Sequence, residues 1–119
     1  MVIIRFRDGV DWFKANWVFR QLAEDTIAAF PQDGDLQFIM MQAQALGALF
    51  LDSMDTDAAS ATTRAIRKVA EGTIQGTIQG WRLTRPEDGV GQQMYLKSIS
   101  ELLDLIRDEE DAEKGDQEK

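Results

Sequence analysis

Three long segments of this chain place apolar side chains every three to four residues, and this helical spacing constrains the fold more than any other feature. The first segment covers residues 12–30, where Asp11 is a suitable N-cap and Pro31 disfavours helical geometry at the residue before it. The second covers residues 36–54 and is apolar nearly all round, which predicts a central helix covered on both sides. The third covers residues 92–107. Short connections between such helices favour a compact antiparallel arrangement.

A tandem Gly-Thr-Ile-Gln repeat between Gly72 and Gly80 is the least ordinary local signal. As a helix, it extends a stripe begun by Ala65 and Val69, along which a neighbouring helix can approach closely. As a strand, it separates the isoleucines from the threonines and glutamines. We favour a helix beginning at Ser60 and leave the strand as the alternative. The predicted fold is therefore all-α, a compact four-helix bundle-like domain.

The first residues allow one addition to this fold. Residues 2–7 are short and rich in β-branched side chains, which fits a short N-terminal strand. Their apolar run is too short for the h-region of a signal peptide, and no segment is apolar for long enough to span a membrane. Together with the absence of cysteine, this predicts a cytoplasmic protein.

The acidity of the chain is concentrated at its C-terminus. The 119 residues carry a formal net charge of -8, and residues 108–119 contain seven acidic residues against two lysines. Because that segment has no apolar residue except Ala112, we predict a single helical domain at residues 1–107 and a disordered acidic tail at residues 108–119. With 44% hydrophobic residues, the domain has enough apolar side chains for a packed core.

Histidine and cysteine are both absent, which removes the side chains best suited to acid–base, nucleophilic or soft-metal chemistry near neutral pH. We therefore expect no enzyme, no cofactor and no metal site. Asp55 and Asp57 do not begin a calcium loop, because the fifth and sixth positions counted from Asp55 are Ala59 and Ser60. Direct nucleic-acid binding is not expected either, since no basic stripe interleaved with aromatic residues occurs.

A non-enzymatic protein-binding role is the alternative that the composition favours. Aromatic residues dominate the energetics of interfaces, and acidic residues steer a basic partner. For Trp17 and Trp81, ordinary core packing is the competing interpretation. The candidate partner-binding residues are Trp17, Glu24, Asp25, Asp52, Asp55, Asp57 and Trp81.

The helical span from about residue 28 to residue 106 resembles, in its pattern, the immunity proteins encoded beside bacterial contact-dependent and type VI secreted toxins. The resemblance rests on Phe30-Pro31, on an apolar helix rich in Gln and Leu that ends at Leu51-Asp52, and on the helix that follows over residues 57–72. It implies a protein that binds one cognate toxin in the producing cell and blocks its active site or the entry of its cofactor. The acidic charge of the chain, taken separately, predicts that this partner is a basic toxin domain.

Two other functions stay open. A phage-type acidic inhibitor that mimics DNA would use the same negative charge. An adaptor or secretion chaperone would self-associate through an apolar face, and the glycine stripe would suit a dimer packed through helices.

Overall fold

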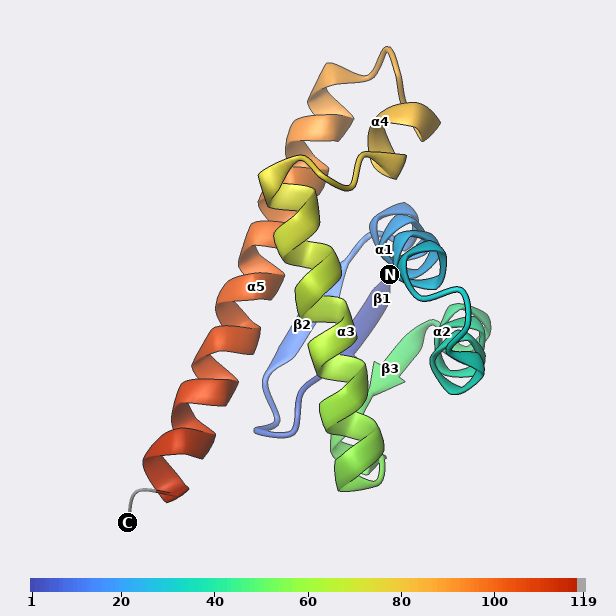
Figure 1. Cartoon of the computed structure of the whole chain (residues 1–119). Coiled ribbons are helices and arrows are strands. Elements are labelled where there is room, and N and C mark those ends of the chain that lie inside the picture. Colours follow the sequence, from blue (N-terminus) through green and yellow to red (C-terminus); the bar gives the residue numbers. More distant parts are fainter. Residues whose placement is uncertain (118–119) are drawn as a thin grey trace.

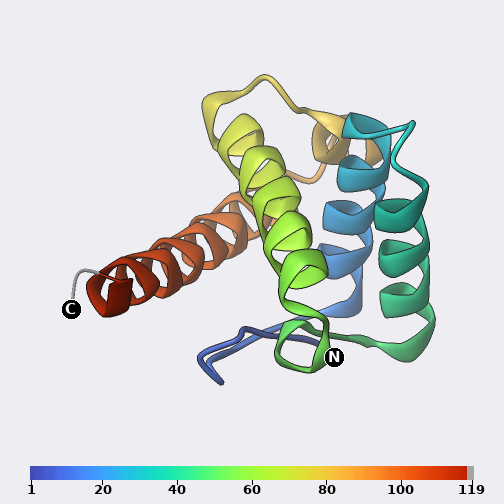
Figure 2. The same cartoon turned by 60° about the horizontal axis from the view of Figure 1, so that its bottom comes forward.

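The computed structural model describes the backbone of residues 1–117 and the side chains of residues 1–111. A small three-stranded sheet is covered on one face by helices (Figures 1 and 2). No described helix is both long and apolar enough to cross a membrane. The fold is mostly helical, as predicted, but the sheet makes it a mixed fold rather than an all-α bundle. The elements in chain order are β1 (Val2–Arg5), β2 (Asp11–Lys14), α1 (Asn16–Ala29), α2 (Gly34–Leu46), β3 (Ala48–Phe50), the 3-10 helix η1 (Leu51–Ser53), α3 (Thr56–Gln75), α4 (Gly80–Thr84) and α5 (Gly89–Gln117).

Strand β1 lies at the centre of the sheet, antiparallel to β2 and parallel to β3. Successive side chains of a strand point to opposite faces, so each strand has a core face and an outer face. Ile4, Trp12 and Leu49 are buried on the core face. Phe13 and Phe50 lie on the outer face and are exposed. The predicted N-terminal strand is confirmed, and two further strands join it.

The helical period of the sequence places Trp12 in the first helix, whereas the structure places it in strand β2. The difference arises from a turn at Asp8 and Gly9, where Gly9 has φ +86° and the chain reverses to pair with β1. The Trp12 side chain is fully buried, and its indole Nε1 donates a hydrogen bond to the backbone carbonyl of Ser98 at 3.1 Å. This contact fixes the sheet against α5.

Helix α1 ends before Pro31, as predicted, but α2 ends at Leu46 rather than at Met54. Gly47 terminates α2 in the left-handed conformation, with φ +71°, and its N–H donates to the carbonyl of Ala43. The chain then enters β3, which pairs with β1. The helical pattern of the sequence does not reveal this pairing. The prediction that this helix is central is wrong, because α2 packs against α1 and β3 and lies at the edge of the molecule (Figure 2).

The glycine repeat forms a helix end instead of a continuous helix or a strand. Helix α3 ends at Gln75, and Gly76 follows with φ +86°. The N–H groups of the next two residues both donate to the carbonyl of Gly72, which closes the helix as a Schellman-type cap. Ile78 folds back over Gly72, and a Cβ on residue 72 would lie only 2.8 Å from the Cδ1 atom of Ile78. The predicted helix is thus confirmed up to Gln75, and Gly80 begins the separate helix α4.

Helix α5 continues well beyond Arg107, the end predicted from its periodicity. Glu109 is only 4% exposed and accepts a hydrogen bond from the backbone N–H of Arg7 at 3.2 Å. One residue further, the carboxylate of Glu110 pairs with the guanidinium of Arg67 on α3 at 2.5 Å. These acids therefore belong to the folded body and tie α5 to the β1–β2 turn and to α3.

Helix α5 also covers most of residues 108–119, the segment for which the sequence predicts a disordered tail. Helix α5 runs to Gln117, and the last two residues of the predicted tail, 118–119, lie outside the described residues. The end of α5 extends past the other elements (Figure 1), which gives the molecule extents of 50 × 26 × 26 Å.

Candidate functional site

Asp25 is a buried acid at the junction of α1, α4 and α5. Its residue exposure is 7%, although the sequence predicts a surface position. Gln21 Nε2 donates to its Oδ1 at 2.9 Å, and the hydroxyl of Tyr95 donates to its Oδ2 at 3.4 Å. The backbone of Gly80 closes over the carboxylate so tightly that a Cβ there would lie 2.3 Å from Oδ1. Burial raises the pKa of the Asp25 carboxyl, against the two hydrogen bonds, which lower it.

Both candidate tryptophans pack beside the same tyrosine. The ring centres of Trp17 and Trp81 lie 6.2 Å and 6.1 Å from that of Tyr95. Trp81 is 4% exposed, and its indole Nε1 is buried with no hydrogen-bond partner within the described part of the chain. Trp17 is half-buried, and the guanidinium of Arg85 lies 4.0 Å from its ring centre. Trp17, Asp25 and Trp81, which the sequence analysis singled out separately, therefore form one packed cluster.

The chemistry of this cluster suits a structural role, in which it holds α1, α4 and α5 together. Burial, followed by the charge of Asp25, raises the pKa of Tyr95, so its hydroxyl stays protonated and is a poor nucleophile. The carboxylate, in turn, is enclosed by Gln21, Tyr95 and the backbone of Gly80. The contacts explain why these polar groups are buried without invoking a reaction.

A second group of candidates lies at the other end of the molecule. Asp52, Asp55 and Asp57 are exposed around η1 and the start of α3, opposite α4 (Figure 1). Phe50, at the end of β3, is 40% exposed and lies two residues before Asp52 in the chain. We call these four residues the acidic end. An exposed aromatic ring close in the chain to exposed carboxylates is suited to a basic protein partner.

A cation beside the acidic end, Arg5, is already paired. The guanidinium of Arg5 lies 5.5 Å from the ring centre of Phe50 and pairs with the carboxylate of Asp11 at 2.9 Å. The hydrogen bond to Asp11 raises the pKa of Arg5, and the charge of Asp52 adds a smaller increase, which shows that Asp52 lies near this pair. Because Asp11 balances Arg5, the negative charge of the acidic end is left to face the solvent.

Helix α2 carries an exposed apolar area that was not among the predicted sites. Phe38, Met41 and Leu46 on α2 are 63%, 64% and 73% exposed, and the small Ala45, one turn after Met41, is exposed as well. No charged residue occurs from Leu36 to Leu51, in a chain with 29% charged residues. We call Phe38, Met41, Ala45 and Leu46 the α2 surface. The sequence signal was present, since α2 is apolar on two faces, but a covered helix and an exposed binding helix share that signal.

Beside the α2 surface, a groove of about 640 Å³ separates α2 from the start of α1. Arg20 lines this groove together with Met41 and Ala45. Glu24, the remaining candidate from the sequence, is exposed one helical turn further along α1. Within the described residues, neither Arg20 nor Glu24 forms an ion pair.

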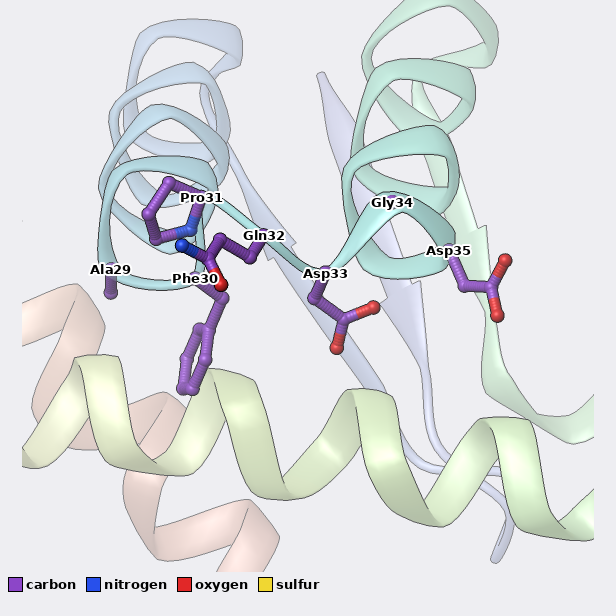
Figure 3. A pocket seen from close by; sticks show the side chains of 7 residues that line it. All are labelled: Ala29, Phe30, Pro31, Gln32, Asp33, Gly34 and Asp35. Atoms are coloured by element: carbon purple, nitrogen blue, oxygen red, sulfur yellow. The ribbon is translucent and has the colours of Figure 1, made fainter.

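A further concavity, of about 710 Å³, lies at the α1–α2 connection (Figure 3). Phe30 points from it towards α3, and the carboxylate of Asp33 accepts a hydrogen bond from the N–H of Leu36 at 3.1 Å. Asp33 is therefore engaged as the N-cap of α2. This concavity is the outer side of a turn and offers no converging reactive groups.

No group of three or more potential ligands among the described residues could hold a metal ion. No protein-family model, curated protein or solved structure matches this chain. The acidic end and the α2 surface are the two exposed surfaces at which a partner could bind.

Proposed function

We propose that this chain is a non-enzymatic immunity protein, which binds a basic toxin domain in the bacterial cytoplasm and occludes its active site. The observation that carries the proposal is the acidic end, where an exposed aromatic ring and three exposed carboxylates lie within eight residues of the chain. An apolar anchor within a charged rim is the usual anatomy of a binding patch.

Charge supports this partner class over a neutral one. The protein carries a net charge of -8, and opposite charges accelerate association and penalise wrong partners. Nucleic-acid-cleaving and nucleotide-modifying enzymes need basic clefts for their substrates, and a protein with a free acidic surface can fill such a cleft. The Phe50 ring would supply contact area that slows dissociation.

The test is co-expression with the products of the adjacent genes, followed by kinetics on any complex. Neutralising Asp52, Asp55 and Asp57 to Asn should lower the association rate about tenfold or more at low salt, with a smaller effect at high salt. Phe50→Ala should instead raise the dissociation rate.

A matched control separates a local contact from the overall charge. Substituting Glu87 with Gln, and Asp104 and Asp108 with Asn, changes the net charge equally at exposed positions elsewhere. If both triple variants slow association equally, the acidic end is not the contact. If no adjacent gene product is toxic or forms a complex, the proposed function is wrong.

A further inference from the structure

The α2 surface is large enough to require an explanation. Phe38, Met41 and Leu46 together expose on the order of 400 Å² of apolar area, comparable to the largest patch on a typical soluble monomer. The surface is free of charge along the whole helix after Asp35. It is distinct from the acidic end, so an inference about it stands or falls independently of the proposed function.

We propose that the α2 surface is the centre of a weak twofold dimer, in which α2 packs antiparallel against α2 of a second copy of this chain. Two copies repel each other through a net charge of -8 each, and they can approach most closely through a face without charges. A twofold contact uses the same patch on both copies, so that patch must be complementary to itself.

The side chains of the α2 surface meet this requirement through their sizes. If the twofold axis passes between Met41 and Gln42, Met41 of one copy faces Gln42 of the other. Phe38 then faces Ala45 of the second copy, so the largest side chain of the patch meets the smallest. Antiparallel packing also keeps the two Asp35 carboxylates at opposite ends of the interface.

Helix α1 supplies self-complementary charge at the edge of the same contact. Arg20 and Glu24 are exposed, four residues apart, and unpaired within the described residues. Arg20 shares the groove with Met41 and Ala45, which places it near the level of the proposed axis. Two α1 helices related by that axis run antiparallel, and Arg20 of each copy then faces Glu24 of the other.

The available area sets the strength of the dimer. A standard interface buries roughly 800 Å² on each partner, and the three apolar side chains of the α2 surface supply about half of that. The flanking faces of α1 add polar area, so the total falls at the low end of specific interfaces. We therefore expect association in the micromolar range or weaker, visible as a concentration-dependent mass.

Sedimentation equilibrium of the full chain, from micromolar to millimolar concentration at physiological salt, tests the proposal. The wild-type protein should shift from monomer to dimer. Phe38→Asp and Met41→Asp should each weaken the dimer at least tenfold, because they bury a charge in an apolar contact. Leu83→Asp is the matched control, since Leu83 is 83% exposed on α4, and it should dimerise like the wild type.

A charge exchange tests the orientation. Arg20→Glu and Glu24→Arg should each weaken the dimer about tenfold, and the double variant should restore it, because two opposed pairs are rebuilt. Lys97→Glu changes the net charge as Arg20→Glu does, at an exposed position on α5, and should have little effect.

Circular dichroism of each variant verifies that it folds. A wild-type protein that stays monomeric at millimolar concentration would overturn the proposal, as would equal dimerisation of Phe38→Asp and wild type. Loss of a toxin partner in Phe38→Asp, with no dimer in the wild type, would show that another protein occupies this surface.

Discussion

Asp25 is an acid that the fold buries against Gln21, Tyr95 and the backbone of Gly80. Desolvation disfavours its charged form, so its pKa in the folded protein lies above the value of the unfolded chain. Between these two pKa values the folded state binds more protons than the unfolded state. The free energy of unfolding therefore falls as the pH rises through this window, and the loss persists at neutral pH.

Asp25→Asn should consequently raise the melting temperature at neutral pH, because the amide keeps an acceptor for Gln21 without a buried charge. The gain should shrink as the pH falls through the raised pKa of the folded state towards about 4, and it should level off below that, where the carboxyl is protonated in both states. Thermal melts across this pH range provide the measurement, with the exposed Asp104→Asn as control. A variant that is less stable than the wild type at every pH would contradict the desolvation argument.

At the scale of elements, the short helix α4 depends on its close approach to α1. It has five residues, too few to be stable alone, so its position relies on Trp81 and on the contact between Gly80 and Asp25. There is no room for a side chain at Gly80, because the carboxylate of Asp25 occupies that position and is held there by Gln21.

Gly80→Ala should therefore lower stability by about 1–3 kcal/mol. Gly89→Ala is the control, since a Cβ at Gly89 meets nothing within 4 Å. Urea unfolding should also show that Gly80→Ala costs less in an Asp25→Ala background, where the obstructing oxygens are gone. Additive costs in the double variant would mean that the two residues do not interfere as the structure indicates.

At the scale of the whole molecule, long-range contacts hold the sheet against the helices. Trp12 joins β2 to α5 through Ser98, and Glu109 joins the far part of α5 to Arg7, more than one hundred positions earlier in the chain. The Glu109 contact holds α5 against the β1–β2 turn beyond Ile106, its last large buried apolar residue.

Deletion of residues 108–119 should thus cost about 1–3 kcal/mol, because it removes a buried carboxylate that accepts a backbone hydrogen bond. Deletion of residues 112–119 retains Glu109 and Glu110 and should change the melting temperature little. Glu109→Ala in the full chain should reproduce most of the larger loss. Equal melting temperatures for both truncations would show that residues 108–111 do not contribute to the fold.

Local signals in the sequence determined the parts of the fold that depend on neighbouring residues. Pro31 ended α1, the period of residues 92–107 produced the core of α5, and the β-branched start formed β1. The exposed positions of Asp52, Asp55 and Asp57 likewise follow from their place in a polar connection. Each of these features is decided within a few residues, where steric limits and helical periodicity act.

Only the tertiary structure decided the rest, because those choices depend on partners distant in the chain. Trp12 fits a helical stripe, yet pairing with β1 and the hydrogen bond to Ser98 place it in a strand. The three residues of β3 are too few to show a period, and their pairing with β1 moved α2 to the edge of the molecule. Burial of Asp25 and exposure of Phe38 follow from the same cause: periodicity shows that a helix has faces, but packing determines which face is covered.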